Sequence, residues 1–253
     1  MKGNLRMAYE FIPERAATLR ATMAETCLRA GRTPETVRLI AVSKTHPPEA
    51  VTAAAAAGIT AFGENRVEEA AGKIATVEAL TAARLEWHMV GHVQSRKAAD
   101  VIAAGFHTVH SVDSVKLATR LGRFAAERPH PAAQRILLEV NLSGEVSKDG
   151  FPAQGWENDA DTRRTLWDAV RQIAALAGVQ IGGLMTIAPI VEEMEAARPV
   201  FAALRRLRDA LAESFPALAL SDLSMGMTDD YPVAIEEGAT LIRIGRALFG
   251  ERG

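Results

Sequence analysis

The stretches RILLEVNL (residues 135–142) and IGGLMTIA (residues 181–188) are nearly continuous apolar runs. Strands that are buried on both faces read in this way, which is typical of a parallel sheet. Runs of this kind alternate along the chain with alanine- and leucine-rich stretches of helical periodicity that end at glycines. Eight runs lie at residues 39–44, 59–65, 86–91, 106–113, 135–142, 181–187, 219–225 and 240–245. Eight β/α repeats predict a closed (β/α)8 TIM barrel.

The length of the chain agrees with a single barrel. It has 253 residues, of which 48% are hydrophobic, and such barrels need about 250 residues. We therefore expect one α/β domain over residues 1–253. The alternative is an open, doubly wound sheet, which usually carries a glycine fingerprint after its first strand. The segment LIAVSKTHPP (residues 39–48) has no glycine there.

Two segments fall outside the repeats. An apolar stripe at three- and four-residue spacing, ended by Gly31, predicts an extra helix before the first strand that packs on the outside of the barrel. Its members are Ala16, Leu19, Met23, Cys27 and Ala30. Residues 143–164 are rich in Gly, Asp and Ser, and they predict a long loop leading into a helix over residues 167–176.

Composition argues against several classes of function. The net charge is −2 with no basic tract, so nucleic acid is not an expected partner. No uncharged apolar run approaches the roughly 20 residues that span a bilayer, and the charged N-terminal segment does not resemble a secretory signal. Cys27 is the only cysteine, which fits a reducing compartment. We expect a soluble, cytoplasmic protein.

Lys44 is the first candidate functional residue, because functional groups of such barrels gather where strands end. In LIAVSKTHPP the apolar strand leads directly into Lys44, and Pro48 suits the first turn of the next helix. A lysine in partly apolar surroundings has a lowered pKa, and its neutral amine can form a Schiff base with an aldehyde. The alternative is a solvated lysine at a strand end.

Three further strand ends carry candidate residues. Asn65 follows the second strand and offers both a donor and an acceptor to a cofactor ring, or it caps the helix over residues 66–71. The segments SDLSMGMTDD (221–230) and TLIRIGRALFG (240–250) pair glycines with small residues before helices. Barrels frequently bind phosphate after strands 7 and 8. The phosphate candidates are Ser224, Gly226, Met227, Gly245 and Arg246; the alternative is ordinary capping by Thr228 and Asp229 and a tight turn at Gly245.

Arg243 lies two residues before Gly245 on the same face of the eighth strand, so its guanidinium is expected to point into the barrel mouth. A buried arginine needs an acceptor, either a ring nitrogen or a carboxylate such as Glu139. Beside a pyridine nitrogen, a permanently charged donor would disfavour protonation of that nitrogen and make the ring a poor electron sink. His88 and His92 are interpreted as non-metal residues, with His88 lining the barrel.

These motifs resemble the pyridoxal 5'-phosphate (PLP) homeostasis proteins, the alanine-racemase-like single-barrel family that includes YggS and the proline synthetase co-transcribed homologue. The resemblance spans nearly the whole chain. It is carried by AVSKTHP (41–47), FGEN (62–65), WHMVGHVQSRK (87–97), HSVD (110–113), NLSGEVSKDG (141–150), GLMTI (183–187), SMGMTDD (224–230) and IRIGRALFG (242–250). Arg66 and Arg96 depart from the family pattern, in which tyrosine and asparagine are common at these positions.

The resemblance implies the fold of the alanine racemase N-terminal domain and a covalent PLP aldimine at Lys44. Asn65 would lie beside the ring, Arg243 near the pyridine nitrogen, and Ser224, Gly226, Met227 and Gly245 around the phosphate. The implied function is storage, buffering or delivery of PLP without catalytic turnover, by a monomer whose partners include apo PLP-dependent enzymes. The alternatives are a slow amino-acid racemase, or a barrel enzyme that uses Lys44 on a sugar phosphate without PLP.

Overall fold

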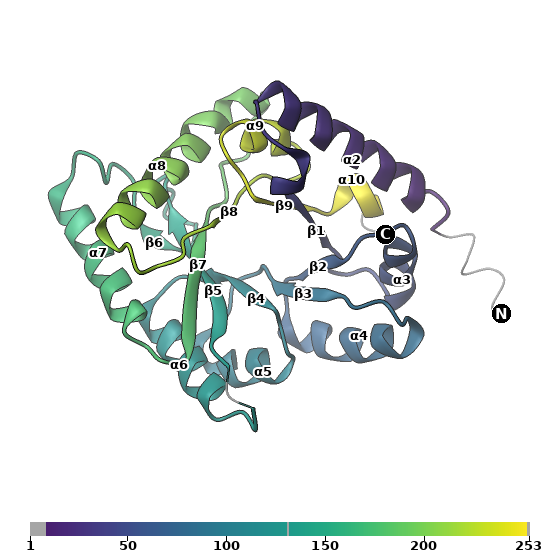
Figure 1. The fold of residues 1–253 in the computed structure, drawn as a ribbon, viewed down its shortest axis with the longest axis horizontal. Coiled ribbons are helices and arrows are strands. Elements are labelled where there is room, and N and C mark those ends of the chain that lie inside the picture. The colour runs from purple at the N-terminus through teal and green to yellow at the C-terminus, as the bar shows by residue number, and fades with distance from the viewer. Residues whose placement is uncertain (1–8, 131, 252–253) are drawn as a thin grey trace.

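The computed structural model describes residues 9–130 and 132–251. The parts of the predicted domain at residues 1–8, 131 and 252–253 lie outside this description. All strand pairs are parallel, and the strand order β4-β3-β2-β1-β9-β8-β7-β5 closes on itself through a β4–β5 pairing. The helices form a ring around the strands (Figure 1). The predicted closed barrel is therefore confirmed, and the open sheet is wrong.

Each predicted run overlaps one barrel strand. The barrel strands are β1 (Arg38–Val42), β2 (Ala61–Glu64), β3 (Glu86–Met89), β4 (Thr108–Val112), β5 (Gln134–Asn141), β7 (Val179–Met185), β8 (Asp222–Ser224) and β9 (Leu241–Ile244). The helices are α2 (Ile12–Arg29), α3 (Pro48–Ala56), α4 (Val67–Leu80), α5 (Ala98–Ala103), α6 (Val115–Ala126), α7 (Ala160–Ala174), α8 (Arg198–Ser214), α9 (Tyr231–Glu236) and α10 (Arg246–Phe249). Within the described residues, no helix combines the length and the apolar character needed to cross a membrane.

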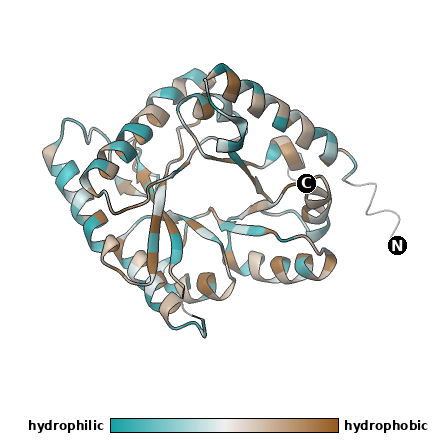
Figure 2. Ribbon diagram, in the orientation of Figure 1, coloured by the Kyte–Doolittle hydropathy of each residue, from teal (hydrophilic) through white to brown (hydrophobic). Residues whose placement is uncertain are grey.

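The apolar residues form two cores. The larger core lies between the strands and the helices, and Figure 2 shows hydrophobic and hydrophilic residues alternating along the helices that cover it. The smaller core has no helical member, which places it inside the barrel. It consists of Ile40, Val42, Ala61, Val90, Leu137, Met185 and Leu241. Because successive strand residues point to opposite faces, both cores are built from the same strands.

The extra N-terminal helix is confirmed as α2. Ala16, Leu19, Met23 and Cys27 of the predicted stripe are buried, and α2 packs against α3, α9 and α10 on the outside of the barrel (Figure 1). Gly31 has a φ of +68°, a conformation that glycine adopts without steric cost. The predicted helix stop is therefore also correct.

The long loop after β5 is shorter than predicted. Helix α7 begins at Ala160, because the Asp159 carboxylate accepts hydrogen bonds from the backbone N–H groups of Asp161 and Thr162 at 2.9 and 3.3 Å. This capping satisfies N–H groups that the first helical turn leaves unpaired. A short extra strand, β6 (Phe151–Pro152), pairs with β5 within the predicted loop. The acidic composition of this segment thus marks a helix start as well as a loop.

Candidate functional site

Lys44 lies in the turn after β1, two residues beyond the end of that strand at Val42. Lys44 is half-buried. Strand β1 pairs with β2 on one side and with β9 on the other, and β9 pairs with β8. The carboxyl ends of parallel strands meet at one end of a barrel. The structure therefore brings Lys44 to the same rim as Asn65, Gly226 and Gly245.

The turn that carries Lys44 is held by a buried ion pair. Lys73 Nζ lies 2.7 Å from Glu64 Oε1 and donates to the Ser43 carbonyl at 2.7 Å. The Ser43 hydroxyl donates to the same Glu64 oxygen at 2.6 Å. On the other side of Lys44, the Thr45 N–H donates to Glu69 Oε1 at 2.7 Å. Both neighbours of Lys44 are thus fixed by side chains from β2 and α4.

Thr45 has a φ of +66°, a left-handed conformation that is uncommon for a residue other than glycine. Such backbone persists only where the surrounding contacts hold it, and the bond from Thr45 to Glu69 is one of these contacts. Burial raises the pKa of Glu64, while hydrogen bonds from Lys73 and Ser43 oppose this shift. Sequence reasoning missed Glu64, Glu69 and Lys73, although the Glu69–Lys73 spacing of four on a helix was a visible signal.

Asn65 directly follows β2 and is half-buried. Helix α4 begins at Val67, and its N-cap is Arg66, which has an extended backbone and no side-chain capping bond. The capping role predicted for Asn65 is therefore wrong. Asn65 instead lines a cavity whose other lining residues include Arg66, Gly91 and Arg96. A Cβ atom at Gly91 would lie 2.4 Å from the Asn65 carbonyl, so only glycine permits this close approach.

The junctions after β8 and β9 lie side by side, as the sequence predicts. Arg246 forms an ion pair with Asp229, and the Ala247 N–H donates to Thr228 Oγ1 at 3.4 Å. Gly245 directly precedes α10. Helix α9 begins at Tyr231, after Asp230, rather than at Thr228 and Asp229 as the capping alternative supposes.

Two of the predicted phosphate residues have internal roles. The Met227 N–H donates to the buried Asp230 carboxylate at 2.6 Å, and burial raises the pKa of Asp230. Gly226 has a φ of +91°, and a Cβ atom there would lie 2.6 Å from the Ala234 Cβ. The backbone conformation and the packing of this turn are therefore sufficient to require glycine at position 226.

Arg243 points into the barrel, as its place in the strand predicts. It is 5% exposed, and it is aligned with the inward-facing Ile40 of β1. Its guanidinium donates to Ser224 Oγ at 2.7 Å and to the Thr186 carbonyl at 3.0 Å. These bonds pair some of the guanidinium N–H groups, which are costly to bury without an acceptor. Burial lowers the pKa of Arg243 to about 10, so the side chain stays charged at neutral pH.

Glu139 acts on Arg243 through space rather than through a contact. The hydrogen bonds of Arg243 go to Ser224 and Thr186, and no ion pair joins Arg243 to Glu139 within the described residues. Burial raises the pKa of Glu139 to about 7, and the charge of Arg243 opposes this rise. The Arg243–Glu139 contact considered from the sequence is therefore not formed.

A line of buried polar side chains runs from Arg243 across the barrel. His110 Nδ1 lies 2.8 Å from Ser224 Oγ, and His110 Nε2 lies 2.9 Å from His88 Nδ1. Burial lowers the pKa of both histidines, so they are neutral at pH 7. The expectation that His88 lines the barrel is confirmed. His110 was missed, because nothing in HSVD distinguishes a network member from any other inward-facing residue.

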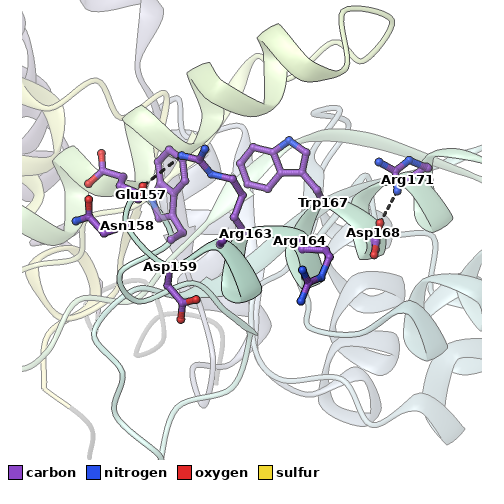
Figure 3. A pocket seen from close by; sticks show the side chains of 10 residues that line it. Glu157, Asn158, Asp159, Arg163, Arg164, Trp167, Asp168 and Arg171 are labelled. Carbon is purple, nitrogen blue, oxygen red and sulfur yellow. Dashed lines mark hydrogen bonds and ion pairs between the residues drawn. The ribbon is translucent and has the colours of Figure 1, made fainter.

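A separate cavity lies beside the start of α7, away from these residues. Figure 3 shows Trp167 and Arg163 on its wall. The rings of Trp156 and Trp167 are stacked with centroids 5.8 Å apart, and the Arg163 guanidinium lies 5.3 Å from the Trp156 ring centroid. None of the predicted site residues lines this cavity.

Comparisons with known proteins agree with this barrel. The family model described as "Alanine racemase, N-terminal domain" matches residues 19–253. The chain is 43% identical over 242 residues to the pyridoxal phosphate homeostasis protein of Pseudomonas aeruginosa, covering 95% of this chain and 96% of that protein. It is 38% identical over 239 residues to the protein of the same name from Aquifex aeolicus, covering 94% and 97%.

Solved structures give the same result. PipY of Synechococcus elongatus, in a structure with PLP bound, is 39% identical, with a TM-score of 0.78, and the match covers 94% of this chain and all of that chain. Alanine racemase from Corynebacterium glutamicum shares the fold, with a TM-score of 0.61 at 19% identity over 60% of its own chain. The chain described here belongs to the pyridoxal phosphate homeostasis protein family, within the wider family of the alanine racemase N-terminal domain.

Proposed function

We propose that this chain binds PLP at the carboxyl ends of β1, β2, β8 and β9, and that it stores, buffers or delivers the cofactor without catalytic turnover. The observation that carries the proposal is that Lys44 follows the end of β1, while the buried, charged Arg243 lies on the neighbouring strand β9 and points into the barrel. Its family relative PipY has a structure with PLP bound. Relatives across most of the chain are named for PLP homeostasis rather than for a reaction.

The donor set of the rim fits the chemical groups of PLP. Lys44 offers an amine for the aldehyde, and the turn on both sides of it is fixed. Arg243 offers a donor for the pyridine nitrogen from inside the barrel. The adjoining loops after β8 and β9 offer backbone N–H groups near Gly226 and Gly245, which suits a phosphate. Asn65 would lie beside the ring.

Some predicted residues would act indirectly. The Ser224 hydroxyl is bonded to Arg243 and His110, so we assign it to orienting the guanidinium rather than to the phosphate. The Met227 N–H is bonded to Asp230, so Met227 would shape the phosphate loop rather than donate to it. Arg246, which is paired with Asp229, is given no direct role toward the cofactor.

The site favours binding over catalysis. Bound PLP can supply an electron sink, which is strongest when its ring nitrogen is protonated. The Arg243 guanidinium keeps its proton at neutral pH, so it would donate a hydrogen bond to the nitrogen without protonating it. We infer that Lys44 holds the cofactor as a Schiff base, and that this arrangement is poorly suited to proton abstraction at a substrate carbon.

The finer features of the proposal concern the whole protein. We propose a single domain over residues 1–253 that works as a monomer, since all the proposed contacts come from one barrel. Apo PLP-dependent enzymes are the proposed recipients of the cofactor. The single cysteine, Cys27, is buried, and its lack of a disulfide partner supports a reducing location such as the cytoplasm.

The direct test is the absorbance spectrum of the protein incubated with PLP and freed of excess cofactor. We expect a visible Schiff-base band that disappears in Lys44→Ala and persists in Lys116→Ala, a matched change at an exposed lysine of α6. Circular dichroism checks that both variants keep the fold. An unchanged band in folded Lys44→Ala protein contradicts the assignment of Lys44.

The slow racemase is the second candidate, because alanine racemase shares this barrel and an imine-forming lysine can accept amino acids by exchange. Exchange of the α-proton in deuterated water distinguishes the two. We expect no exchange at enzyme-like rates across a panel of amino acids. Exchange at about 1 per second or faster would establish catalysis instead.

A further inference from the structure

The amino-terminal mouth of the barrel holds a second group of polar side chains, at the opposite end from Lys44. Glu86 begins β3, His88 lies two residues further into the barrel, and His107 directly precedes β4. His88 and His107 border a cavity that is also lined by Arg38, Arg135 and Asp222, and Glu86 lies beside the two histidines. The proposed function uses none of Glu86, His88 and His107.

Three potential ligand atoms converge here. Glu86 Oε2 lies 3.8 Å from His88 Nε2 and 3.7 Å from His107 Nδ1, and all three atoms lie within 4.8 Å of one another. These separations exceed hydrogen-bond length. Ligands about 2.0–2.1 Å from a tetrahedral zinc ion are roughly 3.4 Å apart. Small side-chain rotations would therefore bring the three atoms to coordination distance.

The buried side chain of His88 gives the strongest indication that a bound ion belongs at this place. Its side chain is 2% exposed, and Nε2 has no hydrogen-bond partner within the described residues. The other ring nitrogen, Nδ1, is bonded to His110 at 2.9 Å. Histidines that bind metals are usually held in this way, with the second nitrogen fixed by a neighbouring group. An unpaired buried nitrogen is costly, and a bound ion would remove that cost.

We propose that Glu86, His88 and His107 form a binding site for a divalent transition-metal ion, best suited to Zn²⁺, at the amino-terminal mouth of the barrel. Two imidazoles and one carboxylate are a common ligand set for zinc. A fourth position, open to the cavity, would take water. This site does not depend on PLP, and it lies outside the proposed cofactor rim.

Two side chains compete for the ligand atoms of this site. The Thr108 hydroxyl lies 3.0 Å from His107 Nδ1. Arg38 Nη2 lies 2.6 Å from the same Glu86 oxygen, so the metal ion must displace Arg38. Both side chains of this pair are more than one third exposed, and exposed pairs are weak. Arg135 is already paired with Asp222 at 2.8 Å. The proposal therefore predicts that removing Arg38 strengthens metal binding.

A second grouping, His92 with Asp113 and Asp149, serves as an internal comparison. Here one nitrogen, His92 Nδ1, lies within ion-pair distance of both carboxylates, at 3.3 and 3.2 Å. His92 and Asp149 are exposed. This grouping has no buried unpaired ligand atom, so we assign no metal to it.

The test is calorimetric titration of untagged, chelator-treated protein with Zn²⁺. We expect one ion per chain. Affinity should fall by about 100-fold or more in His107→Ala and in Glu86→Gln, both changes at partly exposed residues that the fold tolerates. Arg38→Gln should bind more tightly than the unaltered protein, and His92→Ala and Lys44→Ala should bind equally well. Equal binding in Lys44→Ala separates this site from the proposed PLP site.

The imidazole of His88 gives an independent readout. Nuclear magnetic resonance of ¹⁵N-labelled protein should show that Zn²⁺ shifts His88 Nε2 while Nδ1 keeps its proton, because Nδ1 then donates to His110. Absence of stoichiometric binding overturns the proposal. So does binding that is lost in His92→Ala and retained in His107→Ala.

Discussion

At the carboxyl-terminal rim of the barrel the Glu64–Lys73 pair is buried, with side chains 0% and 5% exposed. At the amino-terminal mouth, the Arg38–Glu86 pair has side chains 45% and 39% exposed. The two pairs have nearly equal lengths, 2.7 and 2.6 Å. Distance therefore does not measure their importance. A buried charge depends on its partner, whereas an exposed charge is stabilised by water as well.

The comparison also separates two uses of charge. At the rim, the buried pair fixes the backbone on which Lys44 stands. At the mouth, the exposed pair leaves Glu86 able to exchange Arg38 for another cation. A line of side chains, His88, His110 and Ser224, connects the mouth to Arg243 at the rim. Substitutions at the two ends should therefore differ in how much they change the free energy of unfolding and in the direction of its pH dependence.

The largest expected effect comes from breaking the buried pair. Lys73→Met leaves the Glu64 carboxylate buried without its cation, which costs about 3–5 kcal/mol of folding free energy. Urea unfolding with linear extrapolation measures this loss. The double variant Glu64→Leu with Lys73→Met should recover part of it, because no unpaired charge remains. A loss below about 1 kcal/mol in Lys73→Met would mean that the pair is no stronger than the exposed one.

An effect of intermediate size concerns Glu139, whose pKa is raised from 4.5 to about 7 by burial. The folded protein holds this proton more tightly than the unfolded chain. The stability that Glu139 contributes is therefore fully present below about pH 4.5 and is lost as the pH rises through about 7, on the order of 3 kcal/mol in all.

Urea unfolding between pH 4.5 and 8.5 measures this dependence. Glu139→Gln should reduce the fall in stability over that interval and should be the more stable protein at pH 8.5. Parallel pH profiles for the two proteins would show that Glu139 does not titrate differently in the folded state.

The smallest expected effect lies at the mouth, where Glu86→Gln removes an exposed ion pair worth about 0–1 kcal/mol. The sign of its pH dependence is opposite to that of Glu139, because the pKa of Glu86 is lowered to about 2. Its contribution is present above about pH 4.5 and is lost as the pH falls through about 2. Unfolding of the metal-free protein and of its Glu86→Gln variant at pH 7 and pH 3 measures the stability that the pair contributes and its dependence on pH. A loss above about 2 kcal/mol at pH 7 would contradict the comparison.

Much of the fold could be predicted from the sequence. Each apolar run overlaps one barrel strand, because a strand covered on both faces needs apolar residues along its whole length. The alternation of side chains also predicted that Arg243 points inward. The start of α7 was missed, because Asp159 stands in an acidic segment that resembles a loop until its carboxylate is seen to cap the helix.

The candidate site could be predicted only in part. Lys44, Asn65 and Gly245 were found because they stand at strand ends, and their roles toward PLP stay predictions. The capping role of Asn65 was wrong because Arg66 is extended and α4 starts one residue later. Lys73 and His110 were missed. The Glu69–Lys73 spacing indicated only a pair on one helix, whereas the buried partner Glu64 lies on β2. The partners of His110 lie on β3 and β8, and no local pattern distinguishes it from a core histidine.

The sequence by itself determined the barrel, its extra helix and the end of each strand at which functional side chains gather. These properties depend on the spacing of apolar residues and on the residue types in turns. Both are set by residues that lie near one another in the chain. Only the tertiary structure decided which polar groups meet: Lys73 with Glu64, His110 with Ser224, and Arg243 with Thr186 rather than Glu139. Such pairings depend on strand register and burial, because a polar group inside the barrel must find its partner among residues distant in the chain.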